Sequence, residues 1–150
     1  MAPLSKDEVD ALFEELNPLV STTEQRTEFG KAVYMALFSA YPEYIQLFTK
    51  MQGLTKDNVE ASEGIKYYGQ TFADSILEML QCASDDGKLE AVLEKSGKEH
   101  ITRNVTKQQF LSAEEVFIKH FSGVLTKEEN KQSMERFLKH IVPKVAGFLG

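Results

Sequence analysis

Residues 62–83, SEGIKYYGQTFADSILEMLQCA, carry the periodicity of a long amphipathic helix. Apolar residues recur there at intervals of three and four, as one face of an α-helix requires and a strand does not. The two adjacent tyrosines fall on opposite sides of this pattern. Tyr68 aligns with Ile65 and Phe72, whereas Tyr67 aligns with glutamate, threonine and aspartate. We therefore expect Tyr68 to point into the protein and Tyr67 to point into solvent.

Outside this stretch, helix starts of the capping-box type recur along the chain. In this pattern a serine or threonine caps the first turn, and a glutamate or glutamine three residues later caps back. The pattern occurs at four pairs: Ser5 and Glu8, Thr22 and Gln25, Thr106 and Gln109, Thr126 and Glu129. Apolar residues at helical spacing follow each pair. Each pair therefore predicts the start of an amphipathic helix.

Shorter signals divide the rest of the chain. Pro42 begins a turn of helix, and the run from Ser84 to Gly87 breaks the long helix. A short segment from Lys88 to His100 follows, and a turn through Thr102 to Val105 leads into the next capping box. Neither an alternating strand pattern nor an internal repeat is present. The sequence thus predicts an all-α protein with six to eight helices.

Composition narrows the class of protein. The chain of 150 residues is 42% hydrophobic, enough for one core, so we expect a single domain over residues 1–150. A net charge of −6 without basic clusters argues against nucleic-acid and membrane partners. Cys82 stands alone and cannot form an internal disulfide. With no apolar signal region in MAPLSKDEVD and no stretch of membrane-spanning length, we expect a cytoplasmic protein.

The three histidines differ in their surroundings. His100 ends a mostly apolar stripe, so its imidazole should point inward; such a histidine is more often a hydrogen-bonded core residue than a metal ligand. His120 also lies on an apolar stripe and is interpreted as a core residue. His140 shares its stripe with polar and charged residues and is expected to be exposed. Because no two histidines have ligand spacing, a zinc site is not expected.

A group of residues spread along the chain predicts the fold more specifically when their order and spacing are considered together. In chain order the set is Pro42, Phe48, Tyr68 with Gly69, His100 and Phe110. This order and spacing closely resemble the globin family over nearly the whole chain. In addition, Gly30 lies four residues before Tyr34, where globins place a small residue so that two helices can cross closely. Glycine within a helix costs about 1 kcal/mol relative to alanine, so Gly30 and Gly69 support the match.

The resemblance implies a globin fold around a haem pocket, with haem b (iron protoporphyrin IX) as the cofactor and His100 as the iron ligand. Tyr68 stands where most globins carry the distal histidine, and Tyr34 where the family often carries leucine or phenylalanine. Two distal tyrosines make the chain most similar to the monomeric haemoglobins of parasitic flatworms. The residues expected to line the haem are Phe48, Phe72, Leu93, Val105 and Phe110.

The function that the resemblance implies is reversible binding of molecular oxygen, with carbon monoxide and nitric oxide as further ligands. Two hydroxyl donors near the ligand imply high affinity and slow release, which suits storage or scavenging in a monomeric, non-enzymatic carrier. Lys50 and Arg103 are candidates for pairing with haem propionates. Glu99 replaces the small hydroxyl residue of many globins, so we expect a backbone carbonyl of the preceding turn to orient the imidazole instead.

Three alternatives stay open at this point. Tyr68 could turn outward and leave Tyr34 alone at the ligand. Haem could also support nitric oxide dioxygenation with an external reductase, or peroxidase-like activity, although tyrosine with an ordinary pKa near 10 is a poor distal acid/base. The third alternative is a haem-free all-α sensor or interaction module.

Overall fold

The computed structural model describes residues 1–103 and 105–149, and among these residues it contains helices and no strand. The α-helices are α1 (Lys6–Leu16), α2 (Thr23–Ala40), α3 (Glu63–Gln81), α4 (Asp86–Ile101), α5 (Lys107–Val124) and α6 (Glu128–Ala146). Short 3-10 segments lie between them: η1 (Asn17–Leu19), η2 (Pro42–Leu47), η3 (Thr49–Met51) and η4 (Val59–Ala61). The predicted all-α class is confirmed. Asn104, in the turn predicted before Thr106, lies outside the described residues.

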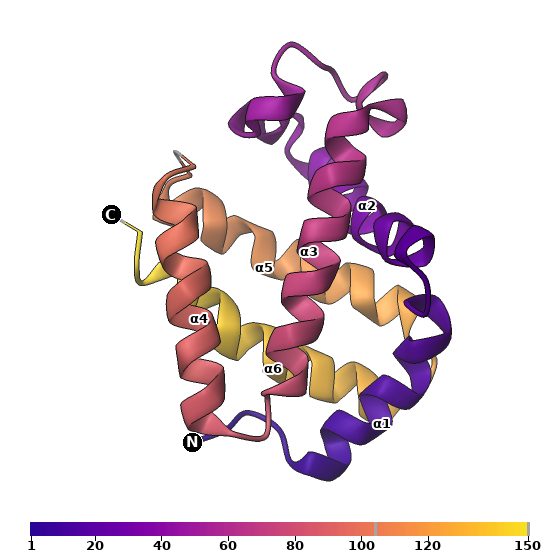
Figure 1. Ribbon diagram of the computed structural model, residues 1–150, viewed down its shortest axis with the longest axis vertical. Helices are drawn as coiled ribbons and strands as arrows, with labels where there is room; N and C mark the ends of the chain where they lie inside the picture. The colour runs from indigo at the N-terminus through magenta and orange to yellow at the C-terminus, as the bar shows by residue number, and fades with distance from the viewer. Residues whose placement is uncertain (104, 150) are drawn as a thin grey trace.

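The helices form two layers around an aromatic-rich core. Figure 1 shows α3 and α4 in front of α5 and α6, with α2 crossing α3 and α1 closing one end. The side chains that fill the space between the layers include Phe38, Phe121 and Phe137, which are fully buried. No helix within residues 1–103 and 105–149 combines the length and the apolar character that a membrane crossing needs.

Three of the four predicted capping boxes are present. At the start of α1 the Ser5 hydroxyl accepts the Glu8 N–H at 3.2 Å, and the Glu8 carboxylate accepts the Ser5 N–H at 2.9 Å. The same reciprocal pairs open α2 at Thr22 and α5 at Thr106. The helix α4 begins two residues earlier than the predicted segment, because the Asp85 carboxylate accepts the Lys88 N–H and caps a helix that starts at Asp86.

The fourth predicted capping box is wrong. The cap residue of α6 is Lys127, without a side-chain cap, and the Thr126 hydroxyl instead donates to Glu15 of α1 at 3.1 Å. The Glu15 carboxylate also accepts the backbone N–H groups of Thr126 at 2.8 Å and Lys127 at 3.0 Å, and the Asn130 side chain at 2.9 Å. A carboxylate from a distant helix therefore takes the role that the local sequence assigned to Thr126 and Glu129.

This arrangement makes stability depend on the charge of Glu15. Burial acts to raise the pKa of Glu15, but the donors from Asn130, Thr126 and Lys127 outweigh it and hold the pKa at about 2. The stabilisation is complete above the ordinary value of 4.5 and is lost as the pH falls from there toward about 2.

We expect Glu15→Gln to lower the free energy of unfolding at neutral pH by about 1–2 kcal/mol, since the neutral amide is a weaker acceptor for the same donors. The difference between wild type and variant should shrink as the pH falls below 4.5. Urea unfolding over an acid pH series measures both effects. A difference that stays constant across the series would contradict the assigned role of the carboxylate.

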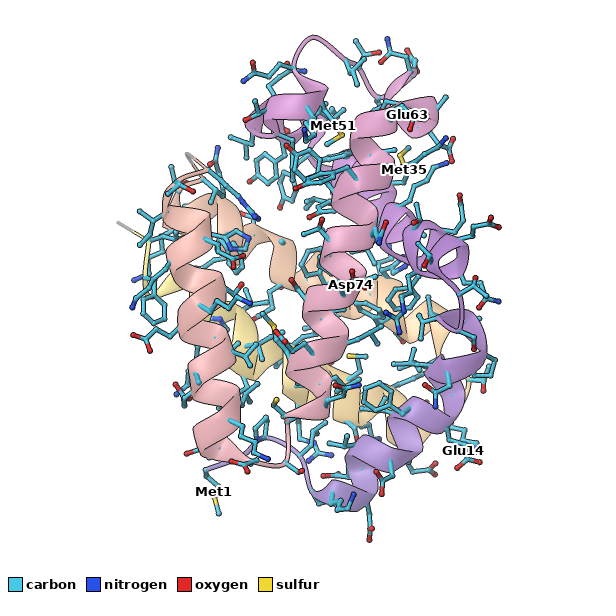
Figure 2. All side chains as sticks on the ribbon, viewed as in Figure 1. Met1, Glu14, Met35, Met51, Glu63 and Asp74 are labelled. Carbon is cyan, nitrogen blue, oxygen red and sulfur yellow. The ribbon has the colours of Figure 1, made fainter. Side chains whose placement is uncertain are left out.

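The crossing of α2 over α3 occurs at two glycines, as predicted. A Cβ atom built on Gly30 would lie 1.8 Å from the carbonyl oxygen of Gly69, and one on Gly69 would lie 2.8 Å from the backbone nitrogen of Lys31. Beside this crossing, Arg26 of α2 forms an ion pair with Asp74 of α3 at 3.3 Å; Figure 2 labels Asp74. Because the two helices are so close here, the inward-facing side chains of α2 and α3 lie next to each other in the interior.

Replacement of Gly30 by alanine should therefore separate α2 from α3 and destabilise the protein by about 1–3 kcal/mol or more, as overpacking does in other cores. Gly123→Ala is the matched control, because Gly123 lies within α5 and a Cβ there meets nothing within 4 Å. That substitution should stabilise the protein by up to about 1 kcal/mol through helix propensity. Chemical unfolding of both variants tests the pair, and equal effects would contradict the steric argument.

Candidate functional site

A cavity of about 340 Å³, partly open to solvent, lies between α2, α3, α4, α5, α6 and the segment of η2 and η3. Its volume falls within the range of about 300–1,000 Å³ that is usual for small-molecule sites. Most of the predicted site residues line it: Tyr34, Phe48, Tyr68, Phe72, His100, Val105 and Phe110. They come from four helices and the segments beside them. The fold thus brings together residues that are up to 76 positions apart, from Tyr34 to Phe110.

Leu93 is the predicted site residue that the cavity lining lacks. Its side chain is 1% exposed and belongs to the hydrophobic core. Leu93 lies two turns before His100 on the apolar stripe of α4 that ends at that histidine. Because the cavity reaches only the end of that helix, the periodicity correctly predicted burial but not contact with the cavity.

His100 lies in the last turn of α4 and faces the cavity. Its Nδ1 atom is 2.7 Å from the backbone carbonyl oxygen of Ser96. A carbonyl oxygen only accepts, so Nδ1 carries the proton and the lone pair of the ring is on Nε2. This confirms the expectation that a carbonyl of the preceding turn orients the imidazole. Glu99 does not take that role, because its carboxylate turns to Arg103 at 3.9 Å.

The surroundings of His100 favour the neutral ring. Burial lowers its pKa below the ordinary histidine value, and the hydrogen bond to Ser96 opposes this only in part. The Phe110 ring packs against the imidazole edge to face, with centroids 5.1 Å apart. A neutral imidazole with a free Nε2, held by a hydrogen bond on the opposite nitrogen, has the form that histidine takes as a metal ligand.

Tyr34 projects from α2 into an aromatic cluster on the cavity wall. Its ring meets Phe48 at 5.2 Å, Phe72 at 5.5 Å and Phe38 at 5.8 Å between centroids. Burial raises the pKa of Tyr34 well above the ordinary tyrosine value, so the hydroxyl keeps its proton at physiological pH. Among residues 1–103 and 105–149, this hydroxyl has no hydrogen-bond partner. The cavity therefore contains an unused hydrogen-bond donor.

Tyr68 points inward as predicted, and its ring packs on Phe48 with centroids 4.9 Å apart. Its hydroxyl accepts the backbone N–H of Lys50 at 3.2 Å, which leaves the hydroxyl proton free for another acceptor. Tyr67 is 54% exposed, as its helical phase predicted, and the Lys50 ammonium lies 4.9 Å from the centre of its ring. The phase of α3 thus turns Tyr68 inward and leaves Tyr67 largely exposed, although Tyr67 also borders the cavity.

Charged side chains line the cavity at Lys50 and Arg103, the two residues considered for propionate pairing. Lys50 rests on Tyr67, and Arg103 lies 3.9 Å from Glu99. The charged groups of Lys50 and Arg103 therefore both border the cavity, and each has only a weak contact, with Tyr67 and Glu99 respectively.

Sequence reasoning missed the contribution of α6. The lining includes Leu138, Ile141, Val142 and Val145 from this helix. Their spacing of three, one and three is that of a continuous helical face, so the signal was present in the sequence. The spacing alone does not indicate that this apolar face of α6 borders a cavity and not a fully packed core.

Comparison with known proteins bears on the fold and the family. Residues 31–145 match the protein family described as Globin. A globin of Isoparorchis hypselobagri is 42% identical over 97% of this chain and 99% of its own length. A globin of Dicrocoelium dendriticum is 40% identical over 98% of this chain and 96% of its own. Both relatives are trematode proteins, in agreement with the predicted resemblance to flatworm haemoglobins.

Solved structures agree at the level of fold. The ferric myoglobin of Aplysia limacina superimposes with a TM-score of 0.81, covering 96% of this chain and 97% of the myoglobin, at 20% sequence identity. The helices described above therefore have the same arrangement as the helices of that protein.

Proposed function

Because this chain belongs to the globin family, we propose that its 150 residues form one monomeric domain that binds haem b and reversibly binds molecular oxygen. The observation that carries the proposal is the state of His100. Its Nδ1 proton is held by Ser96, and its neutral Nε2 is free inside an apolar cavity that two tyrosines also line. A histidine that binds a metal through Nε2 has this form, with its other ring nitrogen donating to a backbone carbonyl.

The residues around the cavity fit haem. His100 would hold the iron, while Phe48, Phe72 and Phe110 would pack against the macrocycle. Lys50 and Arg103 supply positive charge for the propionates. Held by His100, haem would supply an iron atom that can bind a diatomic gas.

The tyrosines are proposed to set the affinity for oxygen. Tyr34 has a hydroxyl proton without an acceptor among the described residues, so it can donate to oxygen in the cavity. The Tyr68 hydroxyl accepts the Lys50 N–H, so its O–H proton is not used in that bond and can be donated to another acceptor. Donation from one or both hydroxyls would slow the release of oxygen, which suits storage or scavenging. Carbon monoxide and nitric oxide are further ligands of the same site.

The same observations favour a carrier over a peroxidase. A peroxidase needs a distal group that both accepts and returns a proton near neutral pH. Burial moves the pKa of Tyr34 away from neutrality, and the cavity lining contains no histidine other than His100 among the described residues. Nitric oxide dioxygenation does not require a distal group that accepts and returns a proton. Consumption of nitric oxide with a reductant tests that activity separately.

Titration of the purified protein with haemin tests the proposal. We expect a Soret band that saturates at one haemin per chain, and repeated, reversible spectral change between oxygen and nitrogen after reduction. Failure to form a Soret band would contradict both haem-based functions and leave the haem-free module. Sustained consumption of nitric oxide with a reductant would favour the enzyme over the carrier.

A further inference from the structure

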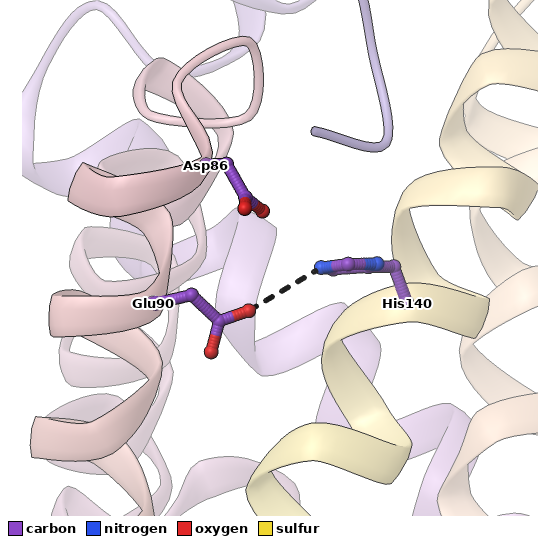
Figure 3. A group of neighbouring side chains, drawn as sticks. All are labelled: Asp86, Glu90 and His140. Carbon is purple, nitrogen blue, oxygen red and sulfur yellow. Dashed lines mark ion pairs between the residues drawn. The ribbon is translucent and has the colours of Figure 1, made fainter. Parts of the chain in front are cut away.

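Three ligand-bearing side chains meet at the far end of α4 from His100. Asp86 and Glu90 lie one turn apart on α4, and His140 faces them from α6 (Figure 3). One oxygen of each carboxylate and one ring nitrogen all lie within 4.8 Å of one another. The Nε2 atom of His140 is 4.0 Å from the nearer Glu90 oxygen. The cluster thus combines an imidazole with two carboxylates from two packed helices.

His140 is not exposed, contrary to the sequence-based expectation. Only 19% of its side chain is accessible, because α4 covers this face of α6. Its Nε2 atom is buried and has no hydrogen-bond partner among residues 1–103 and 105–149. The distance of 4.0 Å to Glu90 is too long for a hydrogen bond. A buried polar atom without a partner is unusual in a folded protein and calls for an explanation.

The ring of His140 is in the form that binds metals. Burial and the nearby Lys144 lower its pKa, and the two carboxylates oppose this only in part. In a neutral imidazole one ring nitrogen keeps a lone pair that can coordinate a cation, and Nε2 of His140 is buried without a partner among the described residues.

Two protein cations already touch the carboxylates. The Met1 ammonium lies 3.1 Å from Asp86, and the Lys144 ammonium lies 2.9 Å from Glu90. Asp86, Glu90 and Lys144 are each more than 40% exposed, so these pairs are held weakly and can exchange for another cation. Neither ammonium satisfies Nε2 of His140, which has no hydrogen-bond partner among residues 1–103 and 105–149.

We propose that Asp86, Glu90 and His140 form a zinc site that joins α4 to α6. Zinc takes imidazole nitrogen and carboxylate oxygen at about 2.0–2.2 Å, commonly with three protein ligands and one water. The imidazole distinguishes it from magnesium and calcium, which prefer oxygen ligands alone. Tetrahedral ligand atoms lie about 3.4 Å apart at such bond lengths, so the two exposed carboxylates close on the buried imidazole when the ion binds.

Calorimetric titration of the full-length protein with zinc chloride tests this site. We expect one zinc per chain, and His140→Gln should weaken binding at least about tenfold, since even outer-shell partners of metal ligands contribute that much. Glu90→Gln should weaken zinc binding similarly. It serves as a second variant because Glu90 is more exposed than His140 and its replacement disturbs the packing less. Lys144→Gln should tighten binding by removing a competing cation. His120→Gln is the matched control and should leave binding unchanged.

Zinc should also raise the melting temperature, because it ties together two helices that separate on unfolding. At a free zinc concentration 100-fold above its dissociation constant, we expect a rise of about 5 °C or more that His140→Gln abolishes. Absence of binding to wild type would overturn the proposal, as would binding that survives His140→Gln, which would place the ion elsewhere, for example at His100. The proposed zinc site lies at the opposite end of α4 from His100, so haemin titration tests the proposed oxygen-binding function separately.

Discussion

We expect His100→Gly to abolish tight one-to-one haem binding, and imidazole added to the buffer to restore it. The substitution removes the nitrogen whose lone pair faces the cavity and leaves a space that free imidazole can enter. The loss of haem affinity should exceed about 100-fold, because His100 is proposed to bind the iron directly and outer-shell partners alone contribute about 10–100-fold. Spectrophotometric haemin titration, with and without imidazole, measures both parts of the prediction.

His120→Gly is the matched control for this experiment. His120 lies in α5, where its ring packs on Phe121, and it is absent from the cavity lining. A glycine in either helix costs about 1 kcal/mol in helix propensity, so general destabilisation affects both variants alike. Haem affinity in His100→Gly equal to that of the control, without imidazole, would contradict the assignment of the iron ligand.

The second large effect is expected at Tyr34. Its replacement by phenylalanine keeps the aromatic contacts with Phe48 and Phe72 and removes only the hydroxyl. A hydrogen bond to a group with charge contributes about 1.5–3 kcal/mol, so oxygen dissociation should accelerate about 10- to 150-fold. Stopped-flow measurement of oxygen release checks this rate.

Two further phenylalanine variants make the result specific. Tyr67→Phe should release oxygen at the wild-type rate, because that side chain is exposed beside Lys50. Tyr68→Phe should accelerate release as well, and it also leaves the Lys50 N–H without its acceptor. Unchanged release in both Tyr34→Phe and Tyr68→Phe would end the hypothesis that tyrosine hydroxyls hold the oxygen. Acceleration in Tyr34→Phe alone would assign the donor role to α2 only.

Local hydrogen bonding explains why much of the fold was predictable. The capping boxes at Ser5, Thr22 and Thr106 join residues three positions apart, so the sequence contains both partners of each bond. Helical phase, which is also local, predicted the inward side of Tyr68 and the outward side of Tyr67. The crossing at Gly30 was predictable for a different reason, since globins place a small residue at the matching position and the resemblance carried that feature over.

The failures share a cause as well. Thr126 has the local pattern of a helix cap, but Glu15, 111 residues away, accepts the Thr126 N–H that Glu129 would accept in a capping box. Leu93 has the periodicity of the His100 stripe and yet lies in solid core, because periodicity specifies a helix face and not what covers it. For His140, the polar neighbours on α6 indicated exposure, whereas α4 packs over it.

The sequence by itself determined the helices, the inward faces of His100 and Tyr68, and the resemblance to globins. Each of these depends on contacts within a few residues of the chain or on spacing along it. Only the tertiary structure decided that α6 lines the cavity, that Glu15 caps α6, and that His140 meets Asp86 and Glu90. Those contacts join segments many turns apart, and their formation depends on how whole helices pack, which no short pattern of residues specifies.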